Sequence, residues 1–210
     1  MPLERKKMRT ILCNETPIVP STLFCIGRNY AEHIKELGNE TPETPVIFFK
    51  PNSTLAELLH VSEHDEPIHY EAEIVFVVGD EGYKAAGIGL DLTKRALQST
   101  LKAKGLPWER AKAFRGAALV SPCTSFTCKE ALRLELWINN VLAQEGKVEQ
   151  MLYTPEALLE ELRAFVDVSE NDLVFTGTPK GVGVVQAGDV FVGKLYEGDL
   201  LLVEQTWRAC

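Results

Sequence analysis

An apolar run that begins with two glutamates constrains this chain more than any other stretch of its sequence. Residues 69–82 read HYEAEIVFVVGDEG, and the segment IVFVV is typical of a strand that is buried on both faces. Alternate residues of a strand project from the same face, so Glu71 and Glu73 should stand side by side. Two carboxylates at that spacing repel each other, and burial makes the repulsion stronger. A fold that buries this strand must therefore place something between or beside them.

One candidate for that partner is a divalent cation. Two carboxylates on one strand face, joined by a third from elsewhere, form the hard-oxygen site that Mg²⁺ or Mn²⁺ prefers. Asp91 is the natural third ligand, because it follows the strand-like segment GIGL and precedes a predicted helix. The alternative is a solvated strand face, where Glu-x-Glu pairs are more often found. The apolar residues that follow Glu73 favour the buried site.

The other predicted elements favour an α+β fold with a mixed or antiparallel sheet, because consecutive strands are often joined without a helix. The segment TPEALLEELRAFV predicts an amphipathic helix with Thr154 as its N-cap and Pro155 at its first position. Asn139-Asn140 predicts a hairpin turn, and Thr93 is a candidate N-cap for a second helix. Further strands are expected near residues 10–13, 23–26, 46–49, 85–90, 132–138, 172–175 and 199–207. We expect one domain over residues 1–210.

Composition narrows the class of protein. The net charge of −8 argues against a nucleic-acid partner, which requires a basic face. No apolar run is long enough to span a bilayer, so we expect no membrane association. The five cysteines are irregularly spaced, with neither zinc-site spacing nor the density of a disulfide scaffold. We therefore expect reduced thiols and a cytoplasmic protein.

Three other patterns are candidates for chemistry. His33 and Glu36 lie three residues apart on a predicted helix, where the carboxylate could fix the imidazole tautomer of a general base; the alternative is a surface pair. TGTPKGVG follows a predicted strand and could present amides and the Thr178 hydroxyl to an anion, or be a plain turn. Lys112 could stabilise an oxyanion near the cation, although most lysines are solvated.

Taken together, these motifs resemble the fumarylacetoacetate hydrolase family, and its single-domain, acylpyruvase-like members in particular. The resemblance extends from about Cys25 to Trp207 and rests on six segments in the family's order: IGRNYAEHIKEL, FFKPNST, HYEAEIVFVVG, GLDLTKRALQ, GLPWERAKAF and FTGTPKGVG. It implies a mixed β-sheet roll with flanking helices, a homodimer, and a mobile lid helix at about residues 28–38. The chain differs from the family where TKRALQ replaces the usual TARDLQ, so that Ala96 stands in place of a carboxylate.

The resemblance also implies roles for individual residues. Glu71, Glu73 and Asp91 match the ligands of Mg²⁺ or Mn²⁺, while His33 and Glu36 match the pair that activates water. Lys112 matches the family's lysine near the metal, held there with help from the residue that matches Gln98. The residues that match substrate-binding positions are Arg28, Lys50, Arg95, Gln98 and Thr178.

The activity that the resemblance implies is metal-dependent hydrolysis of a carbon–carbon bond in a small 2,4-dioxo acid, such as an acylpyruvate or fumarylpyruvate. The same enolate chemistry could instead serve a 2-oxo acid isomerase, or an oxaloacetate tautomerase or decarboxylase. A non-catalytic metal-binding module is a further alternative, but it gives His33, Glu36 and Lys112 no reason to converge.

Overall fold

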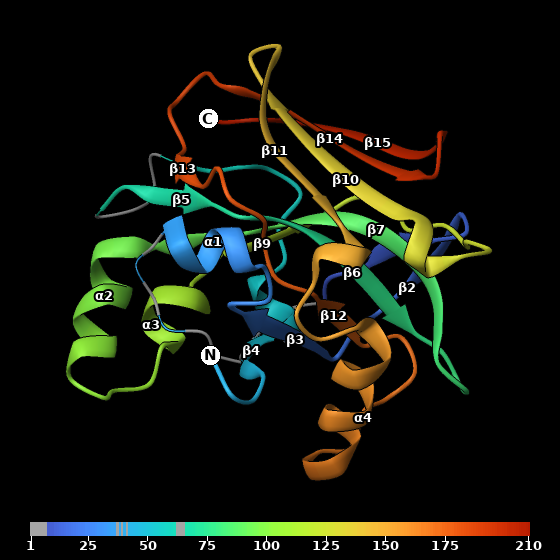
Figure 1. Cartoon of the computed structure of the whole chain (residues 1–210). Coiled ribbons are helices and arrows are strands. Elements are labelled where there is room, and N and C mark those ends of the chain that lie inside the picture. The colour runs from blue at the N-terminus through green and yellow to red at the C-terminus, as the bar shows by residue number, and fades with distance from the viewer. Residues whose placement is uncertain (1–7, 37, 39, 41, 62–65) are drawn as a thin grey trace, which may run out of the picture.

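The computed structural model describes residues 8–36, 38, 40, 42–61 and 66–210. Its largest element is a six-stranded mixed sheet in which β12 and β3 are parallel and the other neighbours are antiparallel. In spatial order its strands are β4 (Val46–Pro51), β3 (Thr22–Gly27), β12 (Leu173–Phe175), β6 (Ala72–Val78), β7 (Tyr83–Asp91) and β9 (Ala118–Val120). Figure 1 shows this sheet crossing the centre of the molecule.

Three smaller sheets surround it. The four-stranded antiparallel sheet has the order β11 (Val141–Lys147), β10 (Leu132–Ile138), β14 (Val190–Glu197) and β15 (Leu200–Arg208). The three-stranded sheet has the order β13 (Gly183–Val184), β5 (Ile68–Tyr70) and β8 (Thr93–Lys94). The two-stranded sheet pairs β1 (Ile11–Cys13) with β2 (Thr16–Ile18).

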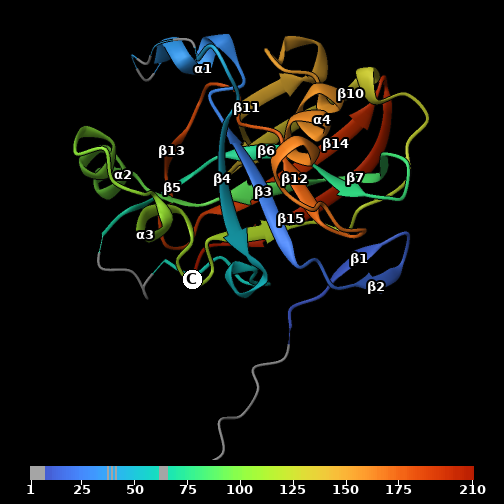
Figure 2. The same ribbon diagram turned by 90° about the horizontal axis from the view of Figure 1, so that it is seen from below.

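Helices flank the sheets. They are α1 (Ala31–Glu36), α2 (Arg95–Ala103), α3 (Glu109–Lys112) and α4 (Pro155–Phe165), and single 3₁₀ turns occupy Asn52–Thr54, Lys129–Ala131 and Val148–Gln150. Figure 2 shows α4 lying over β12 and β3. None of the helices in the described part of the chain is long and apolar enough to cross a membrane.

The core packs against both faces of the six-stranded sheet, and on one face Ile11 of β1 clusters with Val75 and Val77. On the opposite face the four-stranded sheet packs on β6 and β7, where Ile74 and Phe76 meet Leu134 and Leu195. The same face curves under α4, whose buried leucines pack on Phe24 and neighbouring side chains. These curved, layered sheets with few helices confirm the α+β, mixed-sheet-roll fold class that the sequence predicts.

Local sequence signals account for several element boundaries. Thr154 caps α4 as predicted, since its hydroxyl accepts a hydrogen bond from the Ala157 amide at 3.3 Å. Asn139 and Asn140 both have positive φ, 50° and 66°, as a two-residue hairpin turn of type I′ requires. The N-cap prediction for Thr93 is wrong: Thr93 lies in β8, and α2 begins after Lys94 without a side-chain cap.

Candidate active site

Three buried carboxylates meet where the predicted acidic strand breaks. Glu71 lies between β5 and β6, Glu73 is the second residue of β6, and Asp91 ends β7. β6 and β7 are paired, and the Asp91 amide donates a hydrogen bond of 2.8 Å to the Glu71 carbonyl oxygen. Each side chain offers an oxygen within 4.8 Å of the other two, and all three residues are buried. One cation could therefore contact all three.

Two basic side chains neutralise the negative charge of Glu71. Lys112, at the end of α3, places its ammonium 2.7 Å from Glu71 Oε2 and 2.7 Å from Asp91 Oδ2, and also donates to Thr93 Oγ1 at 2.6 Å. Arg95 pairs with the other Glu71 oxygen. Burial alone would raise the pKa of Glu71, but Lys112 and Arg95 outweigh it and lower that pKa. Burial alone would lower the pKa of Lys112, but Asp91 and Glu71 raise it to about 12.

Glu73 differs from the other two carboxylates. Its Oε2 accepts a hydrogen bond of 2.7 Å from the Gly177 amide, but no lysine or arginine in the described segments forms an ion pair with it. Burial raises its pKa well above the ordinary value, and Asp91 and Glu71 raise it further. The cluster is therefore short of positive charge at Glu73. A divalent cation fits both that deficit and the all-oxygen donor set.

Lys50 lies behind the cluster rather than on its open side. Its side chain is fully buried, its ammonium is 2.7 Å from Asp91 Oδ1, and it donates to the carbonyl oxygens of Leu92 and Ala117. These contacts make Lys50 a counter-ion of Asp91. Lys50 therefore lies close to the site, and its contact with substrate stays a prediction.

The predicted His33–Glu36 pair forms on α1. His33 Nδ1 is 3.1 Å from Glu36 Oε2, and the imidazole is buried. The other Glu36 oxygen accepts a hydrogen bond of 3.0 Å from the Gly181 amide, so Glu36 also connects α1 to the loop that follows β12. Of the predicted lid at about residues 28–38, Leu37 lies outside the described residues.

Thr178 and Gln98 also reach the site. Thr178 donates to the Ala72 carbonyl oxygen at 2.9 Å and accepts a hydrogen bond from Gln144 at 2.8 Å. The Gln98 side-chain oxygen accepts a hydrogen bond of 2.8 Å from Arg95, and Gln98 lines the same pocket as Lys112. The help that the resemblance implies Gln98 gives to Lys112 stays a prediction.

These residues surround one small pocket. Eight of the eleven predicted site residues line it: Arg28, His33, Glu71, Asp91, Arg95, Gln98, Lys112 and Thr178. Glu36, Glu73 and Lys50 are not among the lining residues; Glu73 and Lys50 are buried, whereas Glu36 is exposed. Lys102 and Trp108 line the same pocket, and the sequence analysis did not single them out. Nothing local distinguishes Lys102 from a solvated lysine, whereas Trp108 falls within the GLPW segment.

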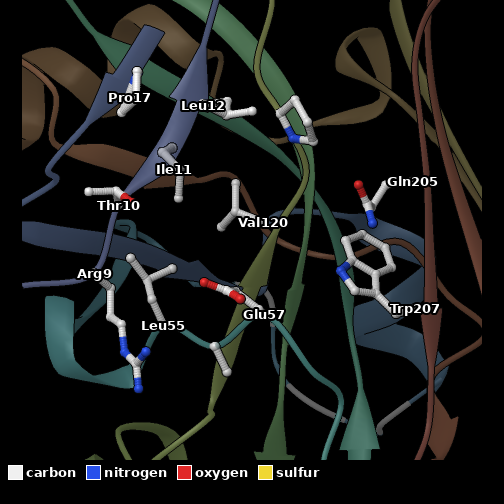
Figure 3. A pocket seen from close by; sticks show the side chains of 12 residues that line it. Arg9, Thr10, Ile11, Leu12, Pro17, Leu55, Glu57, Val120, Gln205 and Trp207 are labelled. Carbon is white, nitrogen blue, oxygen red and sulfur yellow. The ribbon is translucent and has the colours of Figure 1, made fainter. Parts of the chain in front are cut away.

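A second cavity, of about 350 Å³, lies beside β1, β9 and β15. Figure 3 shows its mostly apolar wall, which includes Ile11, Leu55 and Val120. Among the described residues that line it, Arg9 and Glu57 are the charged ones. The carboxylate cluster and its basic partners belong to the first pocket, which is therefore the candidate active site.

Comparison with known proteins places the chain in context. The family described as fumarylacetoacetate (FAA) hydrolase C-terminal matches residues 22–201. Oxaloacetate tautomerase YcgM of Escherichia coli (strain K12) is 36% identical over 187 residues, 80% of this chain and 85% of that protein. Mitochondrial oxaloacetate tautomerase FAHD1 of Arabidopsis thaliana is 35% identical over 189 residues, 79% of this chain and 82% of that protein.

A similar solved structure is that of fumarylpyruvate hydrolase from Pseudomonas aeruginosa in complex with Mn²⁺ and pyruvate. It superposes with a TM-score of 0.88 at 27% sequence identity, and the match covers 99% of this chain and 98% of that one.

Proposed function

Because the chain belongs to the fumarylacetoacetate hydrolase family, we propose that it is a metal-dependent enzyme that acts on small 2-oxo acids through an enolate, with keto–enol tautomerisation of oxaloacetate as its reaction. The observation that carries the proposal is the buried triad of Glu71, Glu73 and Asp91 beside a pocket that also contains His33. The names of the two curated relatives support oxaloacetate as the substrate.

The triad is the proposed binding site for Mg²⁺ or Mn²⁺. When bound there, the ion would supply Lewis-acid stabilisation of negative charge on the keto and carboxylate oxygens of a 2-oxo acid. Lys112 and Arg95 add fixed positive charge beside Glu71, and Thr178 offers a hydroxyl on the pocket wall. Preorganised charges of this kind favour a state in which negative charge develops on the substrate.

We assign the proton transfer to His33. If Glu36 accepts the Nδ1 proton, as their distance allows, Nε2 carries the lone pair of a base. His33 then removes a proton from carbon 3 of the oxaloacetate keto form, and the electrons of that C–H bond move toward the keto oxygen. Return of a proton from the imidazolium of His33 to this oxygen, directly or through a water, gives the enol and restores the neutral base. The reverse sequence restores the ketone.

Hydrolysis of a 2,4-dioxo acid is the second candidate function. It is supported by the similar fumarylpyruvate hydrolase structure and by the same histidine, which could deprotonate water as well as carbon. Water would add to the carbonyl at carbon 4, and cleavage of the bond between carbons 3 and 4 would release a carboxylic acid and pyruvate enolate.

The test is a substrate panel with metal add-back. The rate at which the protein interconverts the oxaloacetate tautomers is measured by the absorbance of the enol. Chelated protein should show this activity only after Mg²⁺ or Mn²⁺ is restored. Parallel product analysis with oxaloacetate and acetylpyruvate would detect decarboxylation and carbon–carbon cleavage. Metal-dependent cleavage of acetylpyruvate without tautomerisation of oxaloacetate would favour the second candidate. Inactivity on both substrates with metal present contradicts the proposed chemistry.

His33→Ala should slow the tautomerisation by a factor of about 10² to 10⁴, the usual contribution of a positioned general base. The measurement is exchange of the carbon-3 protons of pyruvate with deuterated solvent, which isolates the proton transfer. Glu32→Gln is the control, because Glu32 is an exposed residue of the same helix that pairs with Lys180. Normal exchange in His33→Ala would remove this residue from the mechanism.

We also propose that the enzyme is a homodimer. Phe49 and Phe165 are 40% and 54% exposed, with their ring centroids 6.4 Å apart, and an exposed aromatic pair of this kind favours association. Light scattering should therefore give twice the mass of one chain at micromolar concentration. The mass of a single chain under those conditions would contradict the proposal.

A further inference from the structure

The Tyr30 hydroxyl is a buried polar group with no hydrogen-bond partner among the described residues. Tyr30 is only 3% exposed, and it lies just before α1, where its carbonyl oxygen accepts a hydrogen bond of 3.0 Å from the Ile34 amide. Buried hydroxyl groups are nearly always hydrogen-bonded to protein, ordered water or a ligand, because an unpaired one costs the folded state free energy. The surroundings of the ring therefore indicate which group this hydroxyl serves.

The Tyr30 ring packs beside β11. A Cβ added to Gly146 would lie 3.2 Å from the Tyr30 ring and 2.9 Å from the Pro179 ring, so the glycine leaves room for both rings. Gln144 lies two residues earlier on the same face of β11, and its side-chain oxygen accepts a hydrogen bond of 2.9 Å from the Ala72 amide. The ring is therefore next to the start of β6, the strand that carries Glu73.

The residue before Tyr30 packs against the loop that binds Glu73. The Asn29 side chain donates to the Thr176 carbonyl oxygen at 2.8 Å, and a Cβ added to Gly177 would lie 2.8 Å from the Asn29 Cβ. The Gly177 amide in turn donates to Glu73 Oε2. Tyr30 and Glu73 are thus held near each other from two directions, through β11 and through the loop after β12.

The two side chains are chemically complementary. Burial raises the pKa of the Tyr30 phenol, and the charge of Glu73 raises it further, so the phenol keeps its proton. A protonated phenol can donate a hydrogen bond, whereas an ionised carboxylate can only accept one.

We propose that Tyr30 is a positioning residue for Glu73: its hydroxyl donates to one ordered water, which donates to the Glu73 carboxylate and fixes its orientation toward a divalent cation. The inference rests on the proposed function, in which Glu73 is a metal ligand. A water fits here because no group in the described part of the chain is within hydrogen-bond reach of the hydroxyl. The water and the Gly177 amide together orient the carboxylate, as hydrogen bonds to metal ligands commonly do.

The experiment is calorimetric titration of metal-free protein with Mn²⁺ alone. Tyr30→Phe should bind Mn²⁺ about tenfold more weakly than the wild type, the usual effect of removing a group that orients a ligand. Its unfolding temperature in chelator should stay close to that of the wild type, because phenylalanine keeps the ring and no hydrogen bond to the described residues is lost.

Tyr83→Phe is the matched control. The Tyr83 hydroxyl donates to the Pro155 carbonyl oxygen at 3.0 Å, and Tyr83 begins β7, whereas Asp91 ends it. This variant should unfold at a lower temperature than the wild type and bind Mn²⁺ with unchanged affinity.

Three results would overturn the inference: wild-type Mn²⁺ affinity in Tyr30→Phe, equal weakening in Tyr83→Phe, or a Tyr30→Phe protein that does not fold in chelator. The third would give the hydroxyl a structural role independent of the metal. A wild-type protein that binds no Mn²⁺ contradicts the metal site of the proposed function, and the inference with it.

Discussion

At the scale of single residues, the ammonium group of Lys112 already has three hydrogen-bond acceptors within the protein. An ammonium group has three N–H donors, and those of Lys112 are directed to Glu71, Asp91 and Thr93. Lys112 therefore acts as an internal counter-ion of the cluster. A substrate oxygen can contact it only by replacing one of these three acceptors, so a role on an oxyanion requires that Glu71, Asp91 or Thr93 give up its hydrogen bond.

Gln144 is a polar residue that no sequence pattern distinguishes. Its side chain accepts a hydrogen bond from the Ala72 amide and donates to Thr178 Oγ1 and to the Pro179 carbonyl oxygen. A glutamine in a strand with several polar residues is predicted to be an ordinary solvent-exposed side chain. Its partners are 72 and about 35 residues away in the sequence, so only the folded chain reveals that it positions Thr178.

We predict that Gln144→Leu raises KM for the 2-oxo acid with a smaller effect on kcat, because it displaces the loop that carries Thr178 but leaves His33 in place. The measurement is steady-state kinetics of Gln144→Leu, Thr178→Val and the double variant. If Gln144 acts through Thr178, the double variant should be about as impaired as the worse single variant. Additive losses would show that the two residues act independently.

At the scale of elements, the positions of strands and helices could be predicted where local sequence patterns are strong. The geometry of the site could not be predicted in this way. The alternation of Leu132, Leu134 and Leu136 predicts β10, and these residues are buried. The acidic strand is different: it was expected to be continuous, but it is divided at Glu71, where β5 joins another sheet. That break depends on pairing with β8 and β13, which are distant in sequence.

The loop after β12 joins the site to α1, and Gly181 is its critical position. Gly181 has a φ of 98°, and an added Cβ would overlap the Ala143 carbonyl oxygen. We predict that Gly181→Ala lowers the free energy of unfolding by several kcal/mol, more than the roughly 1–2 kcal/mol that a left-handed conformation costs an alanine. Gly188→Ala is the matched control, because φ is 89° there but no atom lies within 4 Å.

Urea unfolding of both variants would measure this difference. The Gly181 amide also binds Glu36, so Gly181→Ala should impair proton exchange of pyruvate beyond its effect on stability. Equal stability losses in the two variants would mean that the overlap with Ala143 is relieved without cost.

The proposed lid can be tested through α1 itself. The pocket that His33 of α1 lines has about 40 Å³ of free space, enough for only a few waters, so we expect α1 to move when a substrate binds. We predict that Mg²⁺ with pyruvate slows hydrogen exchange at the Ile34 amide, which bonds to the Tyr30 carbonyl oxygen. The Leu158 amide of α4 should be unaffected. Equal exchange at Ile34 with and without ligand would argue against a lid.

At the scale of the whole molecule, the sheet order required contacts that no local pattern contains. β12 lies between β3 and β6, so residues 173–175 pair with residues about 150 and 100 positions earlier. The sequence predicts a mixed sheet but not this insertion. It is nevertheless what brings the loop after β12 to the triad, since the Gly177 amide reaches Glu73 directly from the end of that strand.

The triad should therefore link the stability of the whole chain to the metal. In chelator, Glu73→Gln should unfold at a higher temperature than the wild type, because it removes a buried carboxyl group whose raised pKa costs the folded state free energy at neutral pH. When Mg²⁺ is present at about 100 times its Kd for the wild type, the wild type should instead unfold at a higher temperature than Glu73→Gln. The wild type would gain about 2.7 kcal/mol from binding, or roughly 5–10 °C for a chain of this size. Glu57→Gln, in the second cavity, should retain the full shift. A Glu73→Gln protein that is stabilised by Mg²⁺ as much as the wild type would place the ion elsewhere.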